Sequence, residues 1–204
     1  MAEQETPTPQ APAVALPAWE ANPVTPDPRD ARQHAQVAEL AAAVPDAVLE
    51  AVDMAGQVTV LVVTERLLEV FRACREQLGY GFLVDCTAVD WRDRPEGRFD
   101  VVWWLHRHAG EQRLRLKVRV ADGVEVPSAT TSWKTANWME REVWDMFGIR
   151  FAGHPNLERI LTWEGFTGHP LRKDFPVEGI DTGAAIYPDI YPPGGGPTKA
   201  GGAQ

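Results

Sequence analysis

The sequence predicts an α+β fold: a single domain with a mostly antiparallel sheet of about four strands, helices packed on that sheet, and an extended irregular C-terminal arm. Three observations support this prediction. The 204 residues are 44% apolar and include eight tryptophans, which is enough to bury one sizeable core. Helical and strand periodicities follow one another in the order α-β-α-β-β-β-α over 31–147. Two Gly-His-Pro turns then interrupt any regular period over 148–176.

The first elements are a helix at 31–43, a strand at 57–63 and a second helix at 65–78. Thr64 is a residue type that opens helices, and Gly79 is one that closes them. The second helix has apolar residues at helical spacing, namely Leu67, Phe71, Cys74 and Leu78.

Three strands follow at 82–89, 99–106 and 113–121. The connections between them are short enough for antiparallel hairpins. The middle strand is apolar on both faces and points Trp103 and Trp104 in opposite directions. We therefore expect it to lie inside the sheet, partly covered on each side.

The last of these strands contains the run RLRLKVRV, in which charged and apolar residues alternate without exception. The cations on one face are Arg113, Arg115, Lys117 and Arg119. In a chain with a formal net charge of −9, this run is a local exception. Two interpretations stay open: a solvated sheet face, as charge runs usually are, and a docking stripe for an acidic partner segment.

A third helix is predicted to end at Gly148. Two of its residues break the amphipathic pattern, because Glu140 lies within the apolar arc and Trp138 lies among the charges. We expect either an intrachain pair between Glu140 and an arginine that pins the following loop, or an intersubunit contact. We expect the Trp138 ring to lie on a neighbouring loop or on a partner surface. The apolar arc consists of Ala136, Met139, Val143, Met146 and Phe147.

The tripeptide Gly-His-Pro occurs at 153–155 and again at 168–170. Proline disfavours helical backbone for the residue before it, so each copy predicts a turn followed by an extended segment. Two histidines near several carboxylates suggest a metal site, but no His-x-x-x-His or Cys-x-x-Cys spacing accompanies them. We therefore expect no metal site, and we expect the rings of His154 and His169 to bond to backbone groups.

The two ends of the chain differ in composition from the rest. Residues 1–30 hold seven prolines, and residues 177–204 are mostly Gly, Pro, Ala and polar, so both are expected to be flexible tails. The N-terminal part is acidic and lacks the continuous apolar stretch of a secretory signal. No run is long enough to cross a membrane, and the negative charge disfavours nucleic acid. We expect no direct membrane insertion and no nucleic-acid partner.

The cysteines argue against a redox site. Cys74 and Cys86 fall in separate predicted elements, and two dispersed thiols cannot supply the four ligands of an ordinary iron–sulfur cluster. The sequence also lacks a Gly-x-Gly-x-x-Gly turn and a Gly-Lys-[Ser/Thr] phosphate loop. We expect both cysteines to pack in the core and the chain to bind no redox cofactor.

The stretch 140–176 carries a resemblance to a known family. It contains ERE-x-x-DMFGI-x-F-x-GHP-x-L, followed by GHPLRKDFP, and TTSWKTANWMERE leads into it. This run resembles the signature of the C subunit of the proton-translocating NADH-quinone oxidoreductase, respiratory complex I. The similarity extends from residue 37 onward and excludes both tails. At Glu158 the family usually has a basic residue, and here Arg159 follows instead.

The resemblance implies a cofactor-free structural subunit in the hydrophilic arm of that complex. The complex passes electrons from NADH through FMN and iron–sulfur centres to quinone and translocates protons, and the flavin and clusters belong to other subunits. The implied partners are other hydrophilic-arm subunits, especially the quinone-site D subunit. The chain would be peripheral, held on the cytoplasmic side of the cell membrane through the complex.

We therefore interpret 140–176 as an assembly surface, and we expect no catalytic, cofactor-binding or metal-binding residues. In the run LRKDF, Leu171 and Phe175 flank the charges as apolar anchors. The expected interface residues are Trp138, Glu140, Arg141, Glu142, Asp145, His154, His169, Arg172, Lys173 and Asp174.

Two other functions stay open. The first is the equivalent scaffold subunit of a related membrane-bound hydrogenase complex, which would change the electron donor. The second is a free-standing metal-dependent hydrolase, with Glu140 or Glu142 as base and His154 and His169 as metal ligands or acids. The hydrolase hypothesis lacks a nucleophile motif and a complete ligand set.

Overall fold

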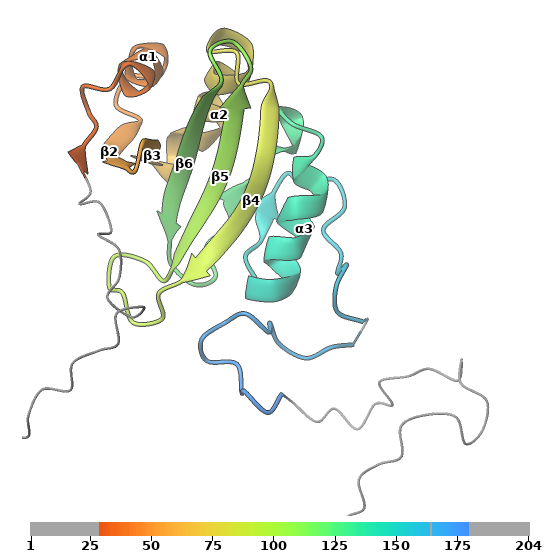
Figure 1. Ribbon diagram of the computed structural model, residues 1–204. Helices are drawn as coiled ribbons and strands as arrows, with labels where there is room; N and C mark the ends of the chain where they lie inside the picture. Colours follow the sequence, from red (N-terminus) through yellow and green to blue (C-terminus); the bar gives the residue numbers. More distant parts are fainter. Residues whose placement is uncertain (1–28, 164, 180–204) are drawn as a thin grey trace, which may run out of the picture.

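The computed structural model describes residues 29–163 and 165–179 (Figure 1). A six-stranded sheet has the order β1-β2-β3-β6-β5-β4, and each neighbouring pair is antiparallel except β3 and β6. A second, small sheet pairs β7 with β8. The strands are β1 (Arg29–Asp30), β2 (Val48–Met54), β3 (Gln57–Val62), β4 (Phe82–Asp90), β5 (Phe99–Arg107), β6 (Gln112–Val120), β7 (Val126–Pro127) and β8 (Phe151–Ala152). The helices are α1 (Ala35–Ala43), α2 (Leu67–Arg72) and α3 (Ala136–Phe147), with short helical turns η1 (Thr64–Arg66), η2 (Ala73–Gln77) and η3 (Ala129–Thr131).

The predicted α+β class is confirmed, and the four predicted strands correspond to β3, β4, β5 and β6. The sequence prediction missed β1 and β2, and it also missed the two-residue strands β7 and β8, which are too short to show a period. Only Ala51 is buried in β2, so this strand has no alternating pattern to detect. Its hairpin to β3 turns through Ala55 and Gly56, both at positive φ (55° and 76°), as a two-residue turn between twisted strands requires.

The first helix begins later than the predicted 31–43. The N–H of Ala31 donates to the Ala51 carbonyl at 3.0 Å, so this part of the chain continues along the sheet edge instead. The His34 side chain then caps α1, because its Nδ1 accepts from the Gln36 N–H at 3.3 Å.

The second predicted helix forms as η1, α2 and η2 in succession, and Gly79 follows it at a φ of 74°. This segment crosses one face of the sheet and delivers the chain to the far edge, where β4 begins. As a result β3 lies beside β6, in parallel, rather than beside β4.

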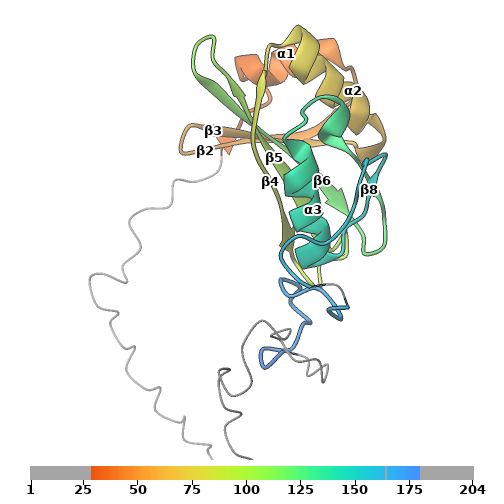
Figure 2. The same ribbon diagram turned by 90° about the vertical axis from the view of Figure 1, so that its right-hand side faces the viewer.

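All three helices cover the same face of the sheet (Figure 2). On that face Trp103 of β5 is fully buried and meets Phe71 of α2 edge-on, with 5.1 Å between ring centroids. Trp104 points to the opposite face, which no helix of the described residues covers. The prediction that this strand lies inside the sheet is confirmed, since β5 is flanked by β6 and β4.

The chain leaves α3 at Gly148 and continues as an irregular arm beside that helix (Figure 1). β8, near the start of the arm, pairs with β7 in parallel. Farther along, the Lys173 N–H donates to the Asp90 carboxylate at 2.8 Å, so the arm also contacts the end of β4. The predicted tails lie largely outside the described residues, at 1–28 and 180–204. None of the described helices combines the length and apolar character that crossing a bilayer requires.

Candidate functional site

Helix α3 buries the apolar arc that its sequence predicted. Gly148 ends the helix in the left-handed conformation (φ 77°), and its N–H donates to the Trp144 carbonyl at 2.8 Å. A Cβ added at Gly148 would lie 2.6 Å from the His169 ring, so the helix end and the arm are in direct contact. The buried members of the arc are Ala136, Val143, Met146 and Phe147.

Glu140 is fully buried, as its place in the arc implied, but its predicted arginine partner is wrong. The carboxylate accepts from the Ser128 hydroxyl and from the Ala129 N–H, both at 2.6 Å. Ser128 immediately precedes the turn η3, and Ala129 is its first residue. Backbone N–H groups at the start of a helical turn have no acceptor within that turn, so the Glu140 carboxylate supplies one. Burial raises the pKa of Glu140 to about 7, although both hydrogen bonds oppose the rise. Glu140 therefore pins the loop before α3 rather than the loop after it.

Asp145 is also fully buried, although its helical position places it opposite the apolar arc. The arm covers it. The carboxylate accepts from the N–H groups of residues 160–162 at 2.8–3.0 Å and lies 2.6 Å from the Arg159 guanidinium. Burial alone would raise the pKa of Asp145, but the hydrogen bonds from Thr162, Leu161 and Arg159 outweigh it and hold the pKa well below its usual range.

Both Gly-His-Pro histidines bond to backbone groups of α3, which confirms that prediction. His154 Nε2 lies 3.1 Å from the Asn137 carbonyl, and His154 Nδ1 accepts from the Asn156 N–H at 3.1 Å. His169 Nδ1 lies 2.9 Å from the Asp145 carbonyl. Burial lowers the pKa of His154, and the bond to Asn137 partly offsets this. The two turns thus fasten the arm at both ends of the helix.

Arg159 was not among the predicted site residues, yet it joins three parts of the site. Besides its pair with Asp145, it donates to the Gly168 carbonyl at 3.1 Å. Its guanidinium carbon lies 5.6 Å from the centre of the Trp144 ring and 5.7 Å from that of Phe166. Its neighbour Glu158, where the family usually has a cation, is exposed. The cation that pairs with Asp145 of α3 is Arg159, and Glu158 is turned to the surface.

The charged run at 172–174 is tied to the sheet. Arg98 lies 2.7 Å from Asp90 and 2.8 Å from Asp174, and it also pairs with Asp122 at 3.2 Å. Arg172 pairs with Asp122 as well and lies over the Phe99 ring at 5.2 Å. Hydrogen bonds from Arg98 hold the pKa of Asp174 below its usual value. Of the three charged residues in this run, Arg172 and Asp174 therefore pair within the chain.

Several other predicted interface residues remain at the surface. Trp138 is 64% exposed, and the Arg141 guanidinium lies over its ring at 5.0 Å. Arg141 also donates to the Glu158 carbonyl at 3.0 Å. Glu142 and the Lys173 side chain are exposed. Leu161 of the arm is 62% exposed, so polar and apolar groups both remain available for contacts around α3.

The hydrolase hypothesis requires Glu140 or Glu142 to meet both histidines, and the structure does not bring them together. Glu140 faces Ser128, Glu142 faces outward, and each histidine ring is engaged with backbone. Over 29–163 and 165–179, no group of three or more His, Cys, Asp or Glu side chains is placed to hold a metal ion.

Both cysteines are buried free thiols, as predicted. Burial raises the pKa of Cys74 to about 12 and raises that of Cys86 well above its usual value. At neutral pH both are therefore protonated and unreactive packing residues.

Comparison with known proteins identifies the group to which this arrangement belongs. The family model described as respiratory-chain NADH dehydrogenase, 30 Kd subunit, matches residues 60–181. The C subunit of NADH-quinone oxidoreductase from Citrifermentans bemidjiense is 44% identical over 137 residues, which cover 67% of this chain and 84% of that protein. The corresponding C subunit from Rhodobacter capsulatus is 47% identical over 137 residues, which cover 66% of this chain and 68% of that protein.

A solved structure has the same fold. It belongs to the membrane-bound sulfane sulfur reductase, which is described as an archaeal respiratory membrane complex. The two structures match with a TM-score of 0.62 and 24% sequence identity, and the match covers 72% of this chain and 86% of that chain. The family model spans more than half of the chain and includes α3, both Gly-His-Pro turns and the charged run that follows. The resemblance carried by 140–176 is thereby confirmed, and the chain belongs to the family of the 30 Kd subunit of respiratory-chain NADH dehydrogenase.

Proposed function

We propose that this chain is a structural subunit of NADH-quinone oxidoreductase that binds no redox cofactor itself. As a member of its family, it is a subunit of a multi-subunit respiratory complex. The relatives named as the C subunit of NADH-quinone oxidoreductase support assignment to that enzyme. In this proposal, FMN, the iron–sulfur centres and the quinone site belong to other subunits.

The observation that carries this proposal is the use of the signature residues inside the chain. Asp145, Arg159, Arg172 and Asp174 form ion pairs that bond the arm to α3 and to the end of the sheet. His154 and His169 do the same through backbone carbonyls. Groups arranged in this way give a segment without regular secondary structure a fixed path. A fixed path suits a surface that other subunits must recognise.

We assign the contact with the quinone-site D subunit to the outer side of α3 and the arm, on the cytoplasmic side of the membrane. This surface carries large apolar side chains next to charged ones, the pattern of interface anchors with a polar rim. Its exposed apolar residues are Trp138, Leu161, Trp163 and Leu171.

The test is a pull-down of the tagged full-length chain from membranes of its own host in mild detergent. We expect co-purification of flavin-containing, iron–sulfur and quinone-site subunits, with NADH-dependent quinone reduction. Recovery of the chain alone, or of an activity driven by hydrogen, would overturn the proposal. Metal analysis of the chain expressed alone is expected to find no stoichiometric metal.

A pair of variants tests the assignment of this surface to the quinone-site subunit. Leu161→Glu places a charge on the arm surface, and Val124→Glu places one on an exposed apolar residue in the turn before β7. We expect Leu161→Glu to reduce recovery of the quinone-site subunit by about tenfold or more and Val124→Glu to leave it unchanged. Equal recovery with both variants would place the quinone-site subunit elsewhere.

A further inference from the structure

The sheet face opposite the helices carries an unusual combination of exposed apolar and cationic side chains. Phe82 and Val84 of β4 are 49% and 46% exposed, and Trp104 of β5 is partly exposed between β4 and β6. The cations predicted from the alternating run project from β6 on this face. An exposed apolar surface with charges at its rim is typical of an interaction site.

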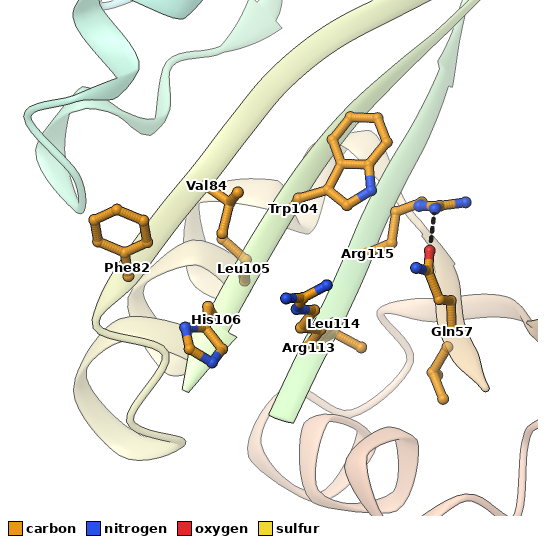
Figure 3. Close-up of a pocket in the computed structure, with 10 residues that line it drawn as sticks. Gln57, Phe82, Val84, Trp104, Leu105, His106, Arg113, Leu114 and Arg115 are labelled. Atoms are coloured by element: carbon orange, nitrogen blue, oxygen red, sulfur yellow. Dashed lines mark hydrogen bonds between the residues drawn. The ribbon is translucent and has the colours of Figure 1, made fainter. Parts of the chain in front are cut away.

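One hollow on this face gathers these groups, as Figure 3 shows. It has a volume of about 330 Å³. Arg113 and Arg115 come from β6, Trp104 and His106 from β5, and Phe82 from β4. None of the residues that line it is Asp or Glu. The hollow therefore combines two guanidinium groups with aromatic surface and contains no counter-charge of its own.

The four cations of β6 are not equivalent. Lys117 and Arg119 each lie 3.6 Å from the buried Asp100, a carboxylate that they share with Arg94. Neither Arg113 nor Arg115 has a carboxylate within 4.0 Å among the described residues. The two halves of the run therefore differ, because Lys117 and Arg119 have a carboxylate neighbour within the chain, whereas Arg113 and Arg115 leave their charges for a group from outside.

Arg115 is held in place for such a contact. Its guanidinium carbon lies 5.0 Å from the centre of the Trp104 ring, and one of its terminal nitrogens donates to Gln57 Oε1 at 2.6 Å. Its Nε is buried and finds no acceptor within the described residues. A stacked, hydrogen-bonded arginine loses little freedom when it binds a carboxylate, which favours binding.

A second hollow of about 340 Å³ adjoins the first and shares Trp104 and Arg115 with it. Its lining is mainly apolar and includes Val52, Val89 and Val102, together with the carboxylates of Glu50 and Asp100, so the unbalanced positive charge lies in the first hollow. The two hollows together run across the sheet from β4 to β2. An extended, shallow surface of this kind suits a polypeptide segment better than a small molecule, which prefers a deep pocket.

We propose that this face binds an acidic segment with apolar anchor residues from a neighbouring subunit of the complex, with a carboxylate of that segment between Arg113 and Arg115 and an apolar side chain against Trp104. The inference rests on the proposed function, because it requires a partner subunit. Charge complementarity selects the partner: the face offers two unbalanced cations on a chain that is otherwise acidic.

The first test compares two double variants with the same charge change. Arg113→Glu/Arg115→Glu reverses the first hollow, and Arg72→Glu/Lys134→Glu reverses two exposed cations on α2 and before α3. In the native pull-down we expect the first variant to lose one subunit by about tenfold or more, and the second to retain all subunits. Equal retention by both variants overturns the inference, whereas failure of the wild-type chain to recover any subunit overturns the proposed function itself.

The second test identifies the occupant without disturbing the charges. A photo-crosslinking phenylalanine analogue replaces Phe82 in the full-length chain, and the complex is irradiated in its host cells. We expect a crosslink to a peptide of another subunit that carries Asp or Glu beside an apolar residue. A crosslink to residues 1–28, to a second copy of this chain or to lipid overturns the inference, and so does the absence of any crosslink when the same analogue at Leu161 reacts with a partner.

Discussion

The Asp145 carboxylate lies 2.6 Å from the Arg159 guanidinium and also accepts hydrogen bonds from three successive N–H groups of the arm, at 160–162. One buried side chain of α3 thus provides partners for backbone groups that no helix or strand satisfies. The Arg159 guanidinium supplies the opposite charge, so the buried carboxylate is both ion-paired and hydrogen-bonded, as a buried charge must be. The path of the arm depends on this relationship.

We expect Asp145→Asn to release the arm from α3. The new amide would direct its own N–H₂ at backbone N–H donors and would leave the largely buried Arg159 without a counter-charge. The free energy of unfolding should fall by about 3 kcal/mol, measured by urea denaturation, and proteolysis within the arm should accelerate. Glu142→Gln, on an exposed position of the same helix, is the control and should stay within about 0.5 kcal/mol of wild type. If proteolysis cleaves the arm of Asp145→Asn no faster than the arm of wild type, Asp145 does not hold the arm on α3.

Gly148→Ala tests the close contact between the end of α3 and the arm. Alanine would adopt a positive φ and would place its Cβ 2.6 Å from the His169 ring. Gly56→Ala is the matched control, since Gly56 has nearly the same φ (76°) and nothing within 4 Å of the added Cβ. We expect Gly56→Ala to cost about 1–2 kcal/mol of unfolding free energy from backbone strain alone. Gly148→Ala should cost about 1–3 kcal/mol more, because the ring must move.

The displaced ring gives this prediction a second measurement. In wild type His169 Nδ1 is held at the Asp145 carbonyl, so the ring nitrogens should have distinct NMR shifts that change in Gly148→Ala but not in Gly56→Ala. If both alanine variants lower the free energy of unfolding by the same amount, the His169 ring moves aside without a loss of stability.

Glu140 should make the stability of the chain depend on pH in a direction opposite to that of the paired aspartates. Its folded pKa of about 7 lies above its ordinary value of 4.5, so between these values the folded state binds more protons than the unfolded state. The stabilising contribution is complete below pH 4.5 and is lost as the pH rises to about 7. At about 1.36 kcal/mol for each unit of pKa, the loss is about 3 kcal/mol.

Glu140→Gln should remove this dependence, because glutamine stays neutral and its carbonyl can still accept from the Ala129 N–H. The measurement is urea unfolding of wild type and variant at several pH values from about 5 to about 8, with Glu142→Gln as a control that keeps the wild-type slope. Parallel curves for wild type and Glu140→Gln would rule out titration of Glu140 in this range.

The parts of the fold that could be predicted from the sequence are those with a strong period. β4, β6 and α3 each bury one clear face, and β5 is an apolar run buried on both faces over its first five residues, so the bounds of all four follow from the apolar pattern. β2 could not be found in this way, because it buries only Ala51, and the two residues of β1 are too few to show any period. The parallel pairing of β3 with β6 depends on the crossover path of the chain, which periodicity does not encode.

The site shows the same limit. The position of Glu140 in the apolar arc correctly predicted that its carboxylate needs a partner. The partners, however, are Ser128 and Ala129, in a loop about twelve residues earlier in the chain, and not an arginine. Asp145 lies opposite the apolar arc of α3, a position at which the helix alone would leave it exposed. It is buried because the irregular arm returns over it, and a segment without a period gives no sign of where it returns. Arg159 was missed for that reason.

Arg172→Glu should weaken assembly with the neighbouring quinone-site subunit while the domain stays folded, and the structure gives the physical reason. The Arg172 side chain pairs with Asp122 and lies over Phe99, so a glutamate would face a carboxylate and lose the ring contact. We expect a loss of about 1–2 kcal/mol in the free energy that holds the end of the arm. Faster proteolysis over 165–179, with an unchanged circular dichroism spectrum, would report it.

Lys173→Glu is the control for this prediction, since it makes the same charge change at the next residue. The Lys173 side chain is exposed, and the residue is held through its backbone, by the N–H to Asp90 and the carbonyl to Arg92, so the variant should leave the arm in place. If Arg172 acts by positioning the arm, Arg172→Glu should lower both arm protection and subunit recovery, whereas Lys173→Glu should leave arm protection unchanged. A different outcome is that both variants recover less of the quinone-site subunit while the arm of each resists proteolysis as it does in wild type. That outcome would show that the partner contacts these charges directly, because the charge change would then act without any movement of the arm.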